Sequence, residues 1–319
     1  MVFARNKELL SFFGEVELKG KKAETASVVS DCDEPLLYYE HTNGKLWLGD
    51  SLKWLKKIPA NSIDLVFADP PYNIKKAEWD NFETQSKYVE WSLLWIEEAA
   101  RILKPEGTLY ICGFSEILAD LKAPSMKFFK SCRWIVWHYK NKANLGNDWG
   151  RSHESILHLR KTKKFTFNID SIRIPYSEHT LRYPTHPQAE TSQYNNGKKD
   201  NHIWEPNPNG AKPKDVIEIP TTCNGMHEKT QHPTQKPEEL LRKIILVSSN
   251  EGDTILDPFT GSGTTQVCAE QLKRKWMGCD ISSNYLDWAV DRIELVEDWS
   301  VEKWIEYDMD NLKRRISIR

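Results

Sequence analysis

The sequence has 319 residues, of which 39% are hydrophobic and 28% are charged, as is typical of a folded globular chain. Its 44 Lys and Arg residues stand against 46 Asp and Glu residues, so the formal net charge of −2 excludes a strongly basic protein. This length fits two domains, or one large α/β domain that carries an insertion.

The apolar runs exclude a membrane-spanning helix, because stretches such as 135–137 and 244–247 are far shorter than the roughly 20 residues required. The chain starts with only a short apolar patch at 9–13 and no cleavage-type tail, so we expect no secretory signal and a cytoplasmic location. Six cysteines form no Cys-x-x-Cys pair, which argues against a disulfide framework and a zinc site. We therefore expect no metal.

The first half of the chain predicts strands that are separated by helices. Residues 1–40 show little periodicity, and we interpret them as an N-terminal arm with one short helix. Apolar residues then recur every three or four positions over 86–103, which predicts a helix that stops at Pro105. The predicted strands are short, apolar or alternating, and bounded by turn formers, at 45–48, 63–68, 108–112, 133–139 and 155–159.

The second half begins with an irregular, polar segment at 165–230, where seven prolines between Pro175 and Pro220 forbid long helices. Regular structure then resumes, with predicted helices at 237–249, 264–272 and 284–296 and predicted strands at 254–257 and 275–280. Strands that alternate with helices predict an α/β fold, with a mostly parallel sheet and helices on both faces.

The first chemical motif is Asp69-Pro70-Pro71-Tyr72, directly after the predicted strand 63–68. Ligands of open α/β sheets bind at the carboxyl ends of strands, and two prolines make a rigid corner without two backbone donors. The Asp69 carboxylate and the Pro70 carbonyl suit the exocyclic amine of a nucleobase, because accepting both of its hydrogens localises the nitrogen lone pair. Tyr72 would stack on the base. A plain proline turn that ends a strand is the alternative.

The second motif is a strand-to-helix turn at 256–265, in which Gly261 and Gly263 permit close approach of the backbone to a ligand. Gln266 replaces the third glycine of the dinucleotide fingerprint, and no Gly-Lys-Ser/Thr follows, so the turn is neither that fingerprint nor a P-loop. Asp280 ends the next strand, close to the offset of about 20 residues at which an acid meets ribose hydroxyls.

Two weaker signals accompany these motifs. His232-Pro233-Thr234-Gln235-Lys236-Pro237 leads into a helix, where Thr234 and Lys236 would bind a carboxylate, although an ordinary helix start explains the segment equally well. Asp50 follows another strand, where a helix N-cap is the simpler role.

Charge is distributed unevenly along the chain. The segment 121–169 holds eleven Lys and Arg residues against two acids, whereas 278–310 holds ten acids against two basic residues. Aromatic residues lie among the basic ones of the first segment, namely Phe128, Phe129, Trp134, Trp137, Tyr139 and Trp149. Aromatic side chains among basic ones suit unstacked bases as well as a core, so the first segment is a candidate nucleic-acid surface. Two solvated surfaces of opposite charge would give the same pattern.

Together these motifs resemble the amino-methyltransferases of DNA, which transfer a methyl group from S-adenosylmethionine to adenine N6 or cytosine N4. The order of catalytic motif, insert and cofactor motif is similar to that of the beta class, and implies a Rossmann-like fold with permuted motifs. The resemblance implies these catalytic residues: Asp69, Pro70, Pro71 and Tyr72. It implies these cofactor-binding residues: Asp50, Asp69, Thr234, Lys236, Asp257, Phe259, Gly261, Ser262, Gly263, Thr264 and Asp280. The segment Asp148 to Glu154 looks like the loop near the flipped base, and the DNA-binding candidates are Trp149, Arg151, His153, Arg173, Arg182, Lys198 and Lys199.

The resemblance also divides the chain and favours one base. It implies an arm at 1–40, a catalytic half at 41–164, a target-recognition insert at 165–230, a cofactor-binding half at 231–298 and an extension at 299–319. Asp69 in the first place of its motif is usual for adenine N6 enzymes, whereas cytosine N4 enzymes more often carry Ser. A cytosine N4 enzyme and a catalytically silent DNA-binding subunit of the same fold remain the alternatives. The implied partners are double-stranded DNA, a cognate restriction endonuclease and a second copy of the chain.

Overall fold

The computed structural model describes residues 20–22, 34–74, 80–141, 147, 149–187 and 203–317. Within them one large sheet contains β1 (Gly20–Lys22), β2 (Leu36–His41), β3 (Gly44–Leu48), β4 (Ile63–Ala68), β5 (Leu103–Gly113), β6 (Ser131–His138), β7 (His153–Arg160), β10 (Val216–Glu218), β11 (Thr254–Asp257) and β12 (Lys275–Asp280). The strand order is β1-β2-β3-β12-β11-β4-β5-β7-β6-β10.

The centre of this sheet is parallel. Strands β3, β12, β11, β4 and β5 run in one direction, β7 is antiparallel to both β5 and β6, and β10 is parallel to β6. β2 lies antiparallel to β3, and β1 to β2. The parallel centre confirms the predicted α/β fold, and its long crossovers bring segments from both halves of the chain to one edge.

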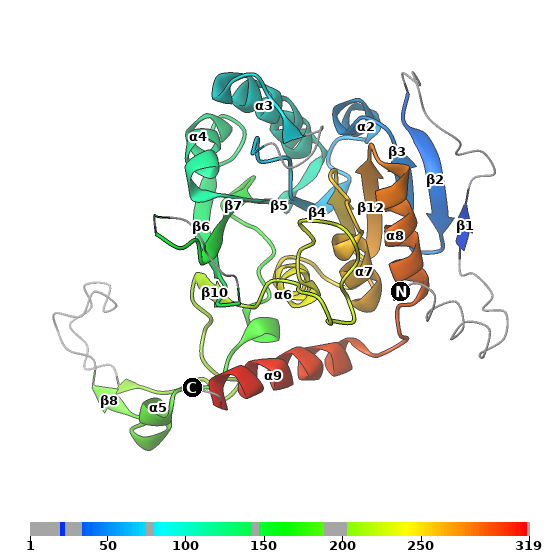
Figure 1. The fold of residues 1–319 in the computed structure, drawn as a ribbon. Helices are drawn as coiled ribbons and strands as arrows, with labels where there is room; N and C mark the ends of the chain where they lie inside the picture. Colours follow the sequence, from blue (N-terminus) through cyan, green and yellow to red (C-terminus); the bar gives the residue numbers. More distant parts are fainter. Residues whose placement is uncertain are drawn as a thin grey trace, which may run out of the picture.

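Helices cover both faces of the sheet, as predicted (Figure 1). One face carries α2 (Ser51–Lys57), α3 (Gln85–Ile102) and α4 (Ser115–Ser125), and the other carries α6 (Glu238–Ser248), α7 (Thr264–Gln271) and α8 (Ser283–Glu294). Alternate residues of β4 serve the two cores, with Val66 packed under α2 to α4 and Phe67 packed under α6 to α8.

A further helix, α9 (Val301–Ser317), lies along the side of the molecule that carries α6 (Figure 1). The Arg242 guanidinium of α6 donates to both carboxylate oxygens of Asp308, at 2.8 and 2.6 Å, and Arg315 of α9 pairs with Glu239. Trp304 is buried in the same core as α6. The structure thus adds a packed helix to the segment that we interpreted only as an extension.

Three local expectations differ from the structure. The described parts of the N-terminal arm include the strands β1 and β2, which we did not expect, because β2 pairs with β3 across a short turn. The short helix that we predicted in this arm lies outside the described residues. β5 already begins at Leu103, so residues 103–107 belong to a strand that starts directly after α3. No element was predicted at α4, whose buried apolar face packs against α3.

The segment 165–230 is irregular in its described part, as expected. It contains the short 3-10 helix η2 (Ile169–Ile172), the short helix α5 (Glu178–Arg182) and the strand pair β8 (His186–Pro187) and β9 (Ile203–Trp204). Its last strand, β10, joins the main sheet. None of the helices in the described ranges is long and apolar enough to span a bilayer.

Candidate active site

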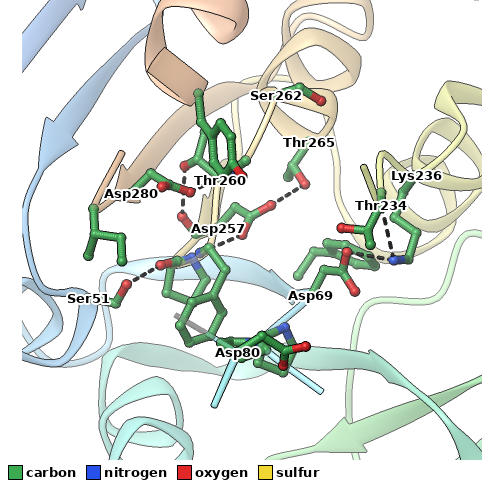
Figure 2. Close-up of a pocket in the computed structure, with 18 of the residues that line it drawn as sticks. Ser51, Asp69, Asp80, Thr234, Lys236, Asp257, Thr260, Ser262, Thr265 and Asp280 are labelled. Carbon is green, nitrogen blue, oxygen red and sulfur yellow. Dashed lines mark hydrogen bonds and ion pairs between the residues drawn. The ribbon is translucent and has the colours of Figure 1, made fainter. Parts of the chain in front are cut away.

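A pocket of about 310 Å³ lies where β3, β4, β11 and β12 end (Figure 2). The predicted catalytic corner and the predicted glycine turn line this one pocket, although 188 residues separate Asp69 from Asp257. Most predicted site residues line it: Asp50, Asp69, Pro70, Pro71, Tyr72, Thr234, Lys236, Asp257, Phe259, Gly261, Ser262, Thr264 and Asp280. Parallel strands bring their carboxyl ends together, which explains this convergence.

The Asp69 carboxylate is held on both of its oxygens. The Tyr72 hydroxyl donates to Oδ1 at 2.6 Å, and the Lys236 ammonium donates to Oδ2 at 2.6 Å. Lys236 belongs to the segment before α6, so this contact joins the two halves of the chain. The predicted contact of Lys236 with a cofactor carboxylate stays a prediction, because in the structure its ammonium faces Asp69.

Burial and charge act in opposite directions on this pair. Burial raises the pKa of Asp69, and the neighbouring Lys236 ammonium only partly offsets that shift. Burial alone would lower the pKa of Lys236, but Asp69 and Glu154 raise it above its usual value, so Lys236 remains protonated. A charged lysine thus lies inside the pocket wall and fixes the direction of the catalytic candidate.

The glycine turn is built around two other buried carboxylates. Asp257 accepts from the Phe259 amide at 2.9 Å and from the Thr265 hydroxyl at 2.5 Å, and burial raises its pKa to about 7. Asp280 accepts from the amides of Gly261 and Ser282 at 2.8 and 2.9 Å, and burial raises its pKa to about 6. Both carboxylates therefore shape the backbone of the turn.

The two glycines of this turn have different tasks. Gly261 has a φ of 52° and lines the pocket, where a Cβ atom would lie 3.0 Å from the His232 ring. Gly263 has a φ of 76° and packs beneath the lining, where a Cβ atom would lie 2.5 Å from that of Ala289 in α8. Gly263 is thus required for helix packing, and its predicted cofactor contact is untested.

Arg292 of α8 stabilises the same turn through hydrogen bonds. Its guanidinium donates to the Ser262 carbonyl at 2.7 Å and to the Thr264 hydroxyl at 3.0 Å. The other side of the guanidinium donates to Glu238 at the start of α6, at 2.8 Å. One arginine therefore ties the glycine turn to the helix that follows Lys236.

An aromatic wall closes one side of the pocket. The Phe259 ring contacts Trp91 and Trp95 of α3, with centroids 5.8 and 5.3 Å apart, and Phe82 lies 5.1 Å from Trp91. Asp50 lines the pocket from the start of α2, where its side chain caps the helix by accepting from the Lys53 amide at 2.8 Å. A flat apolar wall with an acid nearby suits a nucleoside.

The DNA-binding candidates fall into two groups, one near the catalytic corner and one in the insert. Trp149 is 95% exposed, Arg151 lies 3.9 Å over the Phe114 ring, and that ring contacts Tyr72 at 5.0 Å, so this loop adjoins the catalytic corner. His153 lies 3.1 Å from the Ser115 hydroxyl in the same region. The other candidates lie in the insert: Arg173, Arg182, Lys198 and Lys199.

The structure separates the candidates of the insert. Arg173 is engaged within the protein, because it donates to Asp170 at 2.6 Å and to the Gly210 carbonyl at 2.9 Å. Arg182 is exposed at the end of α5. Lys198 and Lys199 lie outside the described residues.

One buried acid of the site, Glu154, was expected only as the end of the segment 148–154 near the flipped base and not as a neighbour of Asp69. It is 7% exposed on β7, accepts from the Tyr72 hydroxyl at 3.1 Å and lies 3.5 Å from the Lys236 ammonium. Its place at the end of the segment 148–154, which resembles the loop near the flipped base, was the available signal. The parts of the chain that the structure describes contain no group of three or more His, Cys, Asp or Glu side chains arranged to hold a metal ion.

Comparison with known proteins assigns this arrangement to a family. The sequence model described as DNA methylase matches residues 63–291. The type II methyltransferase M.HpaI of Haemophilus parainfluenzae is 37% identical over 257 residues, covering 78% of this chain and 74% of that protein. The DNA adenine methyltransferase YhdJ of Escherichia coli (strain K12) is 36% identical over 264 residues, covering 80% of this chain and 84% of its own length.

Solved structures agree on the fold. The PvuII DNA methyltransferase (cytosine-N4-specific) superposes with a TM-score of 0.60 at 20% identity, covering 84% of this chain and 92% of that chain. The M1.HpyAVI-SAM complex superposes with a TM-score of 0.51 at 22% identity, covering 78% of this chain and 99% of its own.

Proposed function

Because this chain belongs to the DNA methylase family, we propose that it transfers a methyl group from S-adenosylmethionine to the N6 amino group of adenine in double-stranded DNA. The observation that carries the proposal is the shared pocket, in which the Asp69 corner and the Gly261 turn face one another. Adenine is favoured because YhdJ is named a DNA adenine methyltransferase and because Asp69 opens the catalytic motif.

The residues of the pocket fit the proposed cofactor. Asp280 lies at the end of β12 and uses one lone pair of each oxygen on backbone amides, which leaves further acceptor capacity for ribose hydroxyls. The aromatic wall around Phe259 would receive the adenine ring of the cofactor, and Gly261 leaves room for close approach. Thr234 lines the far end near Lys236, where the methionine portion would lie.

The chemistry requires a poor nucleophile to be aimed at an activated methyl group. S-adenosylmethionine, when bound, supplies that methyl group on a sulfonium ion. Asp69 and the Pro70 carbonyl accept the two hydrogens of the target amine, which directs the nitrogen lone pair away from the ring. Because Asp69 is fixed by Tyr72 and Lys236, little reorganisation is needed when the amine gains positive charge. The base must leave the duplex to reach this buried corner, at a cost of a few kcal/mol.

The test is the identity of the modified nucleoside. Unmethylated genomic DNA is incubated with the protein and S-adenosylmethionine, digested to nucleosides and analysed by mass spectrometry. N6-methyladenine is the expected product. N4-methylcytosine would replace the proposal by its nearest alternative, and the absence of both, with no heat of cofactor binding in calorimetry, would favour a silent DNA-binding subunit.

The partners follow from the same proposal. The relatives named type II methyltransferases support a restriction-modification role, in which this protein is paired with a cognate restriction endonuclease that recognises the same DNA sequence. Double-stranded DNA is the substrate, and a homodimer is the assembly that we propose. Mapping modified bases by single-molecule sequencing would identify the recognition sequence, and sedimentation equilibrium would measure the oligomeric state.

A further inference from the structure

Glu154 forms a buried cluster with the catalytic corner although it lies in neither recognised motif. Its Oε2 atom is the point of contact for three neighbours, namely the Tyr72 hydroxyl at 3.1 Å, the Lys236 ammonium at 3.5 Å and the Cys112 thiol at 3.7 Å. These neighbours come from the β4 corner, the segment before α6 and β5. Glu154 itself lies on β7, so four separate elements meet at one carboxylate.

The Tyr72 hydroxyl and the Lys236 ammonium are each shared between two carboxylates. The Tyr72 hydroxyl has one hydrogen, yet the Asp69 and Glu154 carboxylates both lie within its reach, at 2.6 and 3.1 Å. Lys236 likewise lies close to both carboxylates, at 2.6 and 3.5 Å. Any movement of Glu154 therefore changes both groups that hold Asp69.

Charge leads to the same conclusion. With Lys236 protonated, one buried ammonium faces the carboxylates of Asp69 and Glu154. Without Glu154, the Lys236 ammonium would neutralise the one remaining carboxylate, and the target amine would meet a cluster with no excess negative charge. When both carboxylates are ionised, Glu154 adds a second negative charge beside the amine as it becomes cationic.

We propose that Glu154 is a positioning residue for methyl transfer, which holds the Lys236 ammonium and the Tyr72 hydroxyl where they orient Asp69. The inference rests on the proposed function, because it concerns the same reaction. Glu154 acts through its neighbours, so its loss slows the transfer step and leaves cofactor affinity unchanged.

The test uses the full chain with Glu154→Gln and a matched control, Glu294→Gln. Glu294 is also a buried glutamate, 9% exposed, and it accepts from a tyrosine hydroxyl, that of Tyr39, but it does not line the pocket. We expect the single-turnover transfer rate of Glu154→Gln to fall about 10- to 100-fold, the range that slight misplacement of a reacting group produces. The rate of Glu294→Gln should stay within about twofold of the unaltered protein, as for residues outside the reacting cluster.

Two further measurements separate positioning from folding. The dissociation constant for S-adenosylmethionine, measured by calorimetry, should change less than about threefold in Glu154→Gln. Glu154→Asp keeps the charge on a shorter side chain, and its rate should lie between those of Glu154→Gln and the unaltered protein. Thermal unfolding of each variant reports whether the fold is intact.

The outcomes distinguish the inference from the function. If the unaltered protein methylates DNA and the Glu154→Gln variant is equally fast, the role of Glu154 is overturned and the proposed function stands. An unaltered protein that transfers no methyl group would overturn the proposed function, and the inference with it. A folded Glu154→Gln variant whose affinity for S-adenosylmethionine falls as much as its transfer rate would also overturn the inference, because the role of Glu154 would then lie in cofactor binding.

Discussion

Asp69 and Asp257 end neighbouring parallel strands and are each followed by proline, yet they are held in different ways. The partners of Asp257 lie two and eight residues further along the chain, in its own turn. Asp69 has one nearby partner, Tyr72, and one that lies 167 residues away, Lys236. The Asp257 carboxylate therefore shapes a local turn, whereas the contacts of the Asp69 carboxylate are complete only when both halves of the chain have folded together.

Replacement of Asp69 should have the largest effect on transfer. Asp69→Asn keeps the shape of the side chain but removes the charge that offsets the cationic amine, so we expect the transfer rate to fall about 10²- to 10³-fold. The affinity for S-adenosylmethionine should change little, as measured by calorimetry. Asp287→Asn is the matched control, because Asp287 accepts from the Tyr38 hydroxyl at 2.7 Å outside the pocket. Full activity of Asp69→Asn would refute the catalytic assignment.

Replacement of Asp257 should alter how stability depends on pH. Because the pKa of Asp257 is raised to about 7, the folded protein holds this proton above the usual carboxyl range, and the group's contribution to stability falls as pH rises from about 4 to about 7. Asp257→Asn cannot ionise, so its stability should improve relative to the unaltered protein over that range, by on the order of 1 to 3 kcal/mol.

Urea denaturation at pH 4.5 and pH 7.5, without cofactor, measures this difference. A constant stability gap between Asp257→Asn and the unaltered protein at the two pH values would contradict the raised pKa.

Removing the hydroxyl of Tyr72 should have an intermediate effect on the rate. Tyr72→Phe keeps the ring against Phe114 but removes the donor to Asp69 and Glu154, so we expect about a tenfold slower transfer, as for the loss of one hydrogen bond to a charged group. Single-turnover kinetics at saturating cofactor measure this. An unchanged rate would mean that Lys236 alone fixes Asp69.

Removing the hydroxyl that donates to Asp257 should have the smallest effect on the transfer rate. Thr265→Val removes the hydroxyl that donates to Asp257, and we expect a loss of about 1 kcal/mol in the free energy of unfolding, with transfer slowed less than by Tyr72→Phe. Comparing thermal unfolding and kinetics for both variants tests the contrast between the two carboxylates. A Thr265→Val variant that slowed transfer more than Tyr72→Phe would contradict this contrast between the two carboxylates.

The same contrast explains how much the sequence could predict. The corner at Asp69 and the turn at Gly261 were predictable because each is a short motif at a strand end, and parallel strands bring such ends to one edge. The partnership of Lys236 with Asp69 was not predictable, because side-chain contacts between distant segments leave no spacing in the sequence. The contacts of Glu154 with Tyr72 and Lys236 were not predictable for the same reason.

Helices and strands were likewise predicted where their pattern is local to the chain. The strongly periodic α3 and the apolar β4 were predicted almost to their ends, because their patterns are local. The strand β2 depends on pairing with β3 and has no strong signal of its own, whereas α9 carries apolar residues at helical spacing that our prediction did not use. Arg173, a DNA candidate by composition, proved to be engaged with Asp170 and Gly210 inside the insert.

The ion pairs between α9 and α6 have a consequence for the catalytic cluster. Arg242 is 3% exposed with α9 in place, and a chain cut after residue 300 would remove both Asp308 and the Trp304 ring that lies over its guanidinium. Glu238 and Gln271 would then be its remaining side-chain partners. Since α6 begins two residues after Lys236, the damage would be transmitted to the lysine that aims Asp69. Faster amide exchange at 236–248 in such a truncated chain would show that α9 stabilises α6 and Lys236 from a distance. Loss of α9 would then lower the transfer rate although no residue of the pocket is changed.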